Sequence, residues 1–139
     1  MTLTTVANPQ IYLAADLGSS ASKFFYRVHP GQTVPLWMGA EVADGLSAVS
    51  VPSLNASGRP QDSAWLQLDD EIVLVGDAAK AFLETNSLMA KKSQMAAYKI
   101  AAALGAIATA EELPYNYDAT VWLALPLTEI RTRNEVAEQ

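Results

Sequence analysis

The pattern of apolar and polar residues near the N-terminus predicts a β-hairpin. Residues 11–15 form a continuous apolar run, which is typical of a strand buried on both faces. Residues 23–28 instead alternate, with Phe24, Tyr26 and Val28 on one side, as in a half-exposed strand. A short loop rich in Gly and Ser joins the two runs. We therefore expect them to pair as an antiparallel hairpin.

The following segment predicts a third strand and then a second hairpin. Residues 29–32 have the composition of a turn, and residues 34–39 that of a strand with a proline near its start. Residues 55–62 hold Ser, Gly and Pro and predict a loop. Two further strand-like runs, 64–68 and 72–75, flank three acidic residues and predict the second hairpin.

The second half of the chain predicts helices followed by one more strand. Asp77 is a suitable N-cap for a short helix reaching about Leu83. Ser93 is a suitable N-cap for a long helix to about Glu112, which ends before Pro114. Three residues spaced i, i+4 and i+7 on this helix predict its packed face: Ile100, Leu104 and Ile107.

The last apolar run, Thr120 to Leu125, stops at Pro126 and predicts a central strand. Because a helix connects it to the first strand, we expect the two strands to be parallel. The predicted fold class is therefore α/β with a mixed sheet, in which an antiparallel, hairpin-led meander is followed by a helix and a parallel strand. We expect one domain over residues 1–139. Its core would comprise residues 10–40 and 93–139, and an irregular insertion with its own hairpin would cover about 41–92.

Composition narrows the possible functions. A chain of 139 residues with 50% hydrophobic residues is long enough for one core, and the absence of cysteine excludes disulfides and thiol chemistry. The net charge of −6 disfavours direct binding to nucleic acid. Lys91, Lys92 and Lys99 are the only local basic group, and we interpret them as a solvated helix face.

The N-terminus does not resemble a secretory signal, and residues 95–110 are too short and alanine-rich to span a bilayer easily. We therefore expect a cytoplasmic protein that does not enter the membrane.

The loop between the first two predicted strands is the main candidate for chemistry. Asp16 ends the first strand, Lys23 begins the second, and small residues lie between them. Such a turn can direct backbone N–H groups at an anion, and lysine adds a positive charge for a phosphate. An aspartate beside a phosphate is reasonable if Mg²⁺ lies between them, held directly or through water. The alternative is an ordinary hairpin turn with a solvated lysine, which the same residues also fit.

Other residues are weaker candidates for a functional site. His29 is the single histidine, lies in the first turn and has no evident partner for metal binding or catalysis. Trp37, Trp65 and Trp122 are most simply explained by packing in the core or at its edge.

Four ordered motifs together resemble the actin, heat-shock chaperone and sugar-kinase superfamily. The segment Asp16–Lys23 is similar to its first phosphate loop, of the form D-x-G-S-x-x-x-K. Val51-Pro52-Ser53 resembles a segment that follows the third strand in plasmid and archaeal actins. Residues 75–80 resemble the hydrophobic-Gly-x-x-Ala element of the same superfamily. Residues 124–129, followed by Arg133 and Asn134, resemble the LPLTE…RN stretch of ParM/StbA-type plasmid-partition actins.

The resemblance implies an actin-type (RNase H-like) domain with this mixed sheet, and it also implies specific roles and ligands. Asp16 would hold Mg²⁺ through water, Lys23 would contact phosphate, and Gly18, Ser19 and Ser20 would supply backbone and hydroxyl donors to ATP or GTP. Ser20-Ala21 replaces the glycines that some relatives have here, which bears on how closely a phosphate can approach. The implied function is the N-terminal nucleotide-binding half of a filament-forming ATPase in plasmid partition. Its partners would be other filament subunits and a DNA-adaptor protein.

No catalytic residue is expected in this chain. In the family, a second domain supplies another phosphate loop, the adenosine site and the residue that positions water, so we expect negligible hydrolysis from this half alone. One rival is a stand-alone, non-hydrolysing interaction or filament-capping module. Another is the opening segment of a sugar kinase or chaperone, which the LPLTE stretch disfavours. Because the last strand would lie near an uncovered edge, we also expect self-association or an exposed hydrophobic face.

Overall fold

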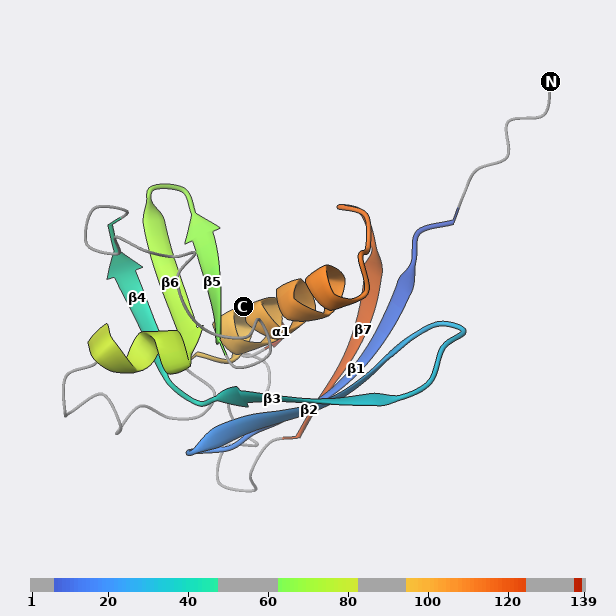
Figure 1. Cartoon of the computed structure of the whole chain (residues 1–139), viewed down its shortest axis with the longest axis horizontal. Helices are drawn as coiled ribbons and strands as arrows, with labels where there is room; N and C mark the ends of the chain where they lie inside the picture. Colours follow the sequence, from blue (N-terminus) through green and yellow to red (C-terminus); the bar gives the residue numbers. More distant parts are fainter. Residues whose placement is uncertain (1–6, 48–62, 83–94, 125–136, 139) are drawn as a thin grey trace.

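The computed structural model describes residues 7–47, 63–82, 95–124 and 137–138 (Figure 1). The predicted Ser93 cap, the segment Val51–Ser53 and residues 125–134 of the last motif lie outside these ranges.

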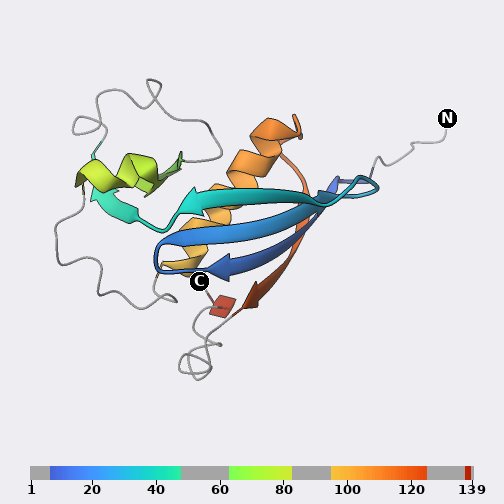
Figure 2. The same ribbon diagram turned by 60° about the horizontal axis from the view of Figure 1, so that its bottom comes forward.

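The main sheet has the predicted mixed topology. Four strands lie in the order β3-β2-β1-β7, as Figure 2 shows from the side: β1 (Gln10–Leu17), β2 (Ala21–Val28), β3 (Val34–Gly39) and β7 (Asp118–Ala124). The pairs β1–β2 and β2–β3 are antiparallel, whereas β1–β7 is parallel. The α/β fold class is therefore confirmed. Within the described residues β7 lies at an edge of the sheet and not at its centre, which agrees with the expectation that the last strand lies near an uncovered edge.

The burial of β1 differs from the prediction. Ile11, Leu13 and Leu17 are buried, but Ala14 and Asp16 on the opposite face are exposed. The strands β2 and β7 pair with β1 on its two sides. Over the described residues, however, only one face of the sheet is covered. The apolar run therefore results from a small alanine on the open face, and burial on both faces was the wrong inference.

A second sheet contains a strand that the sequence did not reveal. It has the order β4-β6-β5, with β4 (Val42–Leu46), β5 (Ser63–Leu68) and β6 (Glu71–Gly76). The β5–β6 hairpin confirms the prediction. The additional strand β4 has an irregular register on β6 between Ala43 and Leu46, and Gly45 there has a φ of 66°. This interruption hides the alternation that identifies a strand.

Two helical segments follow, and both differ in detail from expectation. The short one is a 3-10 helix, η1 (Asp77–Phe82), whose Ala78 N–H donates to Ser63 Oγ at 3.1 Å. Asp77 is its first residue, and its carboxylate pairs with Lys80 at 2.9 Å. The long helix α1 spans Ala96–Ala110, beginning and ending inside the predicted limits.

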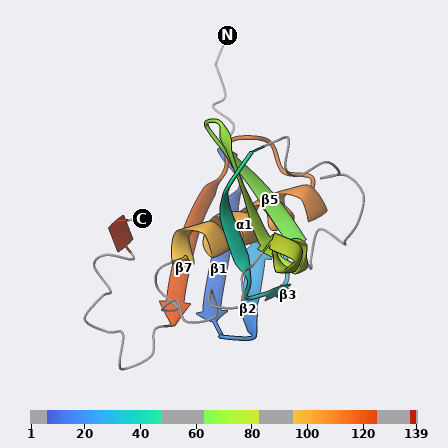
Figure 3. The same cartoon turned by 90° about the vertical axis from the view of Figure 1, so that its left-hand side faces the viewer.

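The helix α1 and the smaller sheet lie on the same side of the main sheet (Figure 3). The predicted face of α1 is confirmed in part: Ile107 is buried, whereas Ile100 and Leu104 are partly buried and pack against the same core. The buried positions are mostly alanines: Ala96, Lys99, Ala102, Ala103, Ala106 and Ile107. Small side chains let the helix approach the sheet closely, and the larger Ile100 and Leu104 lie at the margins. Lys99 is 6% exposed, so its assignment to a solvated face is wrong.

A Schellman motif ends α1 before Pro114 is reached. The N–H of Leu113 donates to the carbonyl of Ala108 at 2.9 Å, and that of Glu112 to Thr109 at 3.4 Å. Glu112 has a φ of 52°, a left-handed conformation that glycine adopts without steric cost. Leu113 packs against the core, which completes the motif.

We expect Glu112→Gly to stabilise the fold by about 1 kcal/mol, because glycine relieves the left-handed strain and a negative charge leaves the helix C-terminus. Urea unfolding measures the change. Glu112→Gln is the control for charge alone and should give a smaller gain. Equal gains from the two variants would show that the backbone conformation contributes nothing.

Candidate phosphate-binding loop

The pleat of the hairpin places Asp16 and Lys23 opposite each other at one end of the main sheet. Their Cα atoms are register partners on β1 and β2. Their chain neighbours Leu17, Ser22 and Phe24 are buried, so the two charged side chains share the opposite, outward face. The structure thus brings together the two charges that the sequence singled out. Both are exposed, as a group that meets an external ligand must be.

The loop between them is too tight for any side chain at position 18. A Cβ atom on Gly18 would lie 2.5 Å from the carbonyl oxygen of Ala21, which is backbone and cannot rotate away. The Gly18 N–H donates to the carbonyl of Asp16 at 3.2 Å, so it closes the turn. A close backbone approach therefore requires this glycine.

The serines of the loop differ in accessibility. Ser19 and Ser20 are exposed, and within the described part of the chain their amides have no hydrogen-bond partner. They are the loop groups available to an anion. Ser22 is only 1% exposed and lies on the inward face, where its hydroxyl also lacks a hydrogen bond. It therefore does not face the side on which Asp16 and Lys23 lie.

Trp37 is a neighbour of this site that the sequence pattern did not reveal. Trp37 on β3 is the register partner of Lys23, and the lysine ammonium lies 5.2 Å from the centroid of its ring. Cations are attracted to the faces of aromatic rings, tryptophan most strongly. Only the pairing of β2 with β3 brings the two side chains together, although both strands were predicted from the sequence.

The remainder of the outward face is aromatic and uncovered. Tyr12 and Trp122 stack with their ring centroids 6.1 Å apart, and the Arg27 guanidinium lies 5.1 Å from the Tyr12 ring. Phe25, Trp37 and Trp122 are each more than half exposed. The expected exposed hydrophobic face is thus present. Trp65 is 45% exposed, so none of the three tryptophans is buried in the core.

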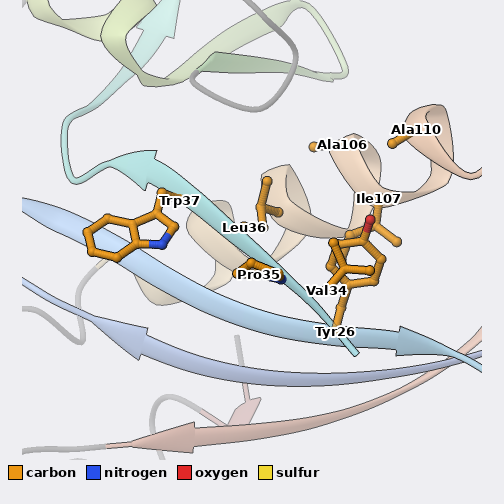
Figure 4. A pocket seen from close by; sticks show the side chains of 8 residues that line it. All are labelled: Tyr26, Val34, Pro35, Leu36, Trp37, Ala106, Ile107 and Ala110. Carbon is orange, nitrogen blue, oxygen red and sulfur yellow. The ribbon is translucent and has the colours of Figure 1, made fainter. Parts of the chain in front are cut away.

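A separate cavity of about 280 Å³ lies between β3 and the C-terminal half of α1 (Figure 4). The side chains of the residues that line it are apolar apart from the polar atoms of Tyr26 and Trp37, and they include Leu36 and Ile107. The Tyr26 hydroxyl donates to Glu111 Oε1 at 2.9 Å. Burial, followed by the hydrogen bond and the charge of Glu111, raises the pKa of Tyr26 to about 12. No lysine, arginine or histidine is among the residues that line this cavity, so it does not suit a phosphate.

Over the described ranges, no three His, Cys, Asp or Glu side chains gather closely enough to hold a metal ion. Within the same ranges no helix has the length and apolar character needed to cross a bilayer.

Comparisons with known proteins give one structural similarity. No family model matches the chain, and no curated protein matches it. Among solved structures, the crystal structure of apo pSK41 ParM protein is similar, with 15% sequence identity and a TM-score of 0.48. The match covers 93% of this chain and 41% of that one, so this chain spans less than half of that protein's length.

We expect Gly18→Ala to destabilise the fold by about 1–3 kcal/mol, because the new methyl group forces the hairpin loop to move. Gly105→Ala is a matched control, since that helical glycine has open space around its Cβ position. The control should stabilise the chain by about 0.5–1 kcal/mol. Thermal and urea unfolding compare the two, and an unchanged Gly18→Ala variant would contradict the tight loop.

Tyr26 should make the fold sensitive to alkaline pH. Its pKa in the folded chain is about 12, against 10.0 ordinarily, so its contribution to stability is complete below pH 10 and is lost as pH rises towards 12. Tyr26→Phe should therefore lose less stability over this range, after an initial cost of about 0.5–1.5 kcal/mol at neutral pH. Tyr115→Phe, at a fully exposed position, should behave as the unaltered chain does. Unfolding in urea across this pH range is the measurement, and parallel curves for Tyr26→Phe and the unaltered chain would refute the assignment.

Proposed function

We propose that this chain is the N-terminal, nucleotide-binding part of an actin-like ATPase of the plasmid-partition type. The observation that carries the proposal is the placement of Asp16 and Lys23 opposite each other beside a loop that only glycine can close. This arrangement lies at the carboxyl end of β1, where the four ordered sequence motifs begin. A hairpin leading through a helix to a parallel strand is also the arrangement that the sequence resemblance implies.

The residues present fit a Mg²⁺-nucleotide. Lys23 supplies a positive charge for a phosphate oxygen, and Ser19 and Ser20 supply amides and hydroxyls. Asp16 supplies an exposed carboxylate beside the loop. A single carboxylate is enough for Mg²⁺, because this ion keeps most of its ligands as water and phosphate oxygens. When bound, the ion would offset the charge between Asp16 and the phosphates.

This loop would form one wall of the site. Phosphoryl transfer requires charges and positioning groups on both sides of the phosphates. We therefore assign binding, and not hydrolysis, to this part alone, with ATP or GTP as ligand. A second domain would complete the site and raise the affinity.

Filament formation and partners belong to the same proposal. The outward face exposes Phe25 and Trp122, and β7 has one unpaired edge among the described strands. Surfaces of this kind favour association with other protein surfaces. Other subunits of the filament and a DNA-adaptor protein are the partners we propose, in the cytoplasm. A non-hydrolysing interaction module would use the same surface without a nucleotide, so nucleotide binding separates the two functions.

Titration with Mg-ATP, followed by calorimetry or by NMR, tests the loop. Asp16→Ala and Lys23→Ala should each weaken binding about tenfold, since hydrogen bonds to charged groups contribute about 1.5–3 kcal/mol. Removing Mg²⁺ with chelator should weaken binding to the unaltered chain but affect Asp16→Ala much less. Asp70→Ala, in the β5–β6 turn, and Arg27→Ala, on the same strand as Lys23, are controls that should retain binding.

The nucleotide function is wrong if the intact chain binds no Mg-ATP either alone or mixed with a C-terminal half of such an ATPase. Equal losses in the control variants would instead indicate binding by charge in general, without a site at the loop.

A further inference from the structure

Lys23 has two neighbours in the sheet that can hold its ammonium group. Its register partner on β1 is Asp16, and its register partner on β3 is Trp37. The ammonium lies over the Trp37 ring, and no ion pair joins Asp16 and Lys23, both of which are described residues. The lysine ammonium therefore lies over the ring and forms no ion pair with the carboxylate on the opposite strand.

The two arrangements are close in free energy. An exposed ion pair contributes about 0–1 kcal/mol, and an exposed cation–π contact about 0.5–1 kcal/mol. Removing the ring would therefore be enough to shift Lys23 towards Asp16. Lys23 would then occupy the place of Mg²⁺ beside Asp16 and neutralise its carboxylate. The same lysine would no longer be available to a phosphate.

We propose that Trp37 is a positioning residue that keeps Lys23 apart from Asp16, so that Asp16 stays available to Mg²⁺ and Lys23 to a nucleotide phosphate. This inference rests on the proposed function of the loop. Trp37 acts through Lys23 and need not touch the nucleotide itself.

The position of Trp37 suits this role. Its chain neighbours Leu36 and Met38 are buried, which fixes the strand, while the indole itself is 57% exposed and open to a cation. Phe25 lies on the same outward face with 56% exposure, but no cation lies over its ring within the described structure. Phe25 is therefore a matched control for the loss of an exposed aromatic ring from this face.

The first measurement needs no nucleotide. In the unaltered chain the ring current of Trp37 should shift the NMR signals of the Lys23 side-chain methylene protons upfield, with Lys23→Arg used for assignment. The shift should disappear in Trp37→Leu and remain in Phe25→Leu. In the Trp37→Leu background, Asp16→Asn should then move the Lys23 signals, because the lysine has become its partner. Absence of the upfield shift in the unaltered chain would overturn the inference.

The second measurement is a double-mutant cycle on Mg-ATP affinity. Trp37→Leu should weaken binding about two- to fivefold, the equivalent of one exposed cation–π contact. Trp37→Phe should recover part of this loss, and Phe25→Leu should cause none. In a Lys23→Met background, Trp37→Leu should have no further effect, because its influence passes through the lysine.

The outcomes separate this inference from the function on which it rests. If the unaltered chain binds Mg-ATP and Trp37→Leu binds equally well, the positioning role is wrong while the nucleotide site stands. Additive losses in the cycle would overturn it too, since they indicate a purely structural effect of Trp37. If the chain and its completed form bind no Mg-ATP, the proposed function fails together with the ligand role of Trp37, whatever the NMR shift shows.

Discussion

The packing of β1 against α1 is the interaction on which the rest of the structure depends. β1 lies inside the main sheet, with β2 antiparallel on one side and β7 parallel on the other. Its inward residues Ile11 and Leu13 are fully buried in the same core as the alanines of α1. Burying a side chain of this size contributes about 1.5–3 kcal/mol, and the short alanines let helix and sheet approach closely.

This packing also determines the geometry of the loop. Because Leu17 is anchored inward at the last position of β1, the pleat turns Asp16 outward at the position before it. The antiparallel register then sets Lys23 opposite Asp16, and β3 sets Trp37 beside Lys23. The chemistry of the loop thus follows from one buried face, and a register slip of one residue would reverse every side chain involved.

The parts of the fold that were predicted correctly depend on local patterns. Alternation in β2 and the Gly/Ser loop identify the first hairpin, and they bring Asp16 and Lys23 together without further information. β4 escaped notice because Gly45 and an irregular register interrupt its alternation, and its partner β6 is remote in sequence. The predicted helix face was incomplete, because the large apolar residues mark only part of the contact and close packing also buries alanines and Lys99.

The sequence by itself determined the α/β class, the order of the main strands and the charged pair flanking a glycine loop, because strand period and turn chemistry are local properties. Tertiary structure alone decided which face of β1 is covered and that the Lys23 ammonium lies over the Trp37 ring. These features depend on contacts between segments far apart in the chain. A side chain on the face of a sheet can contact the strand on either side of its own. The local sequence pattern does not show which of the two it will contact.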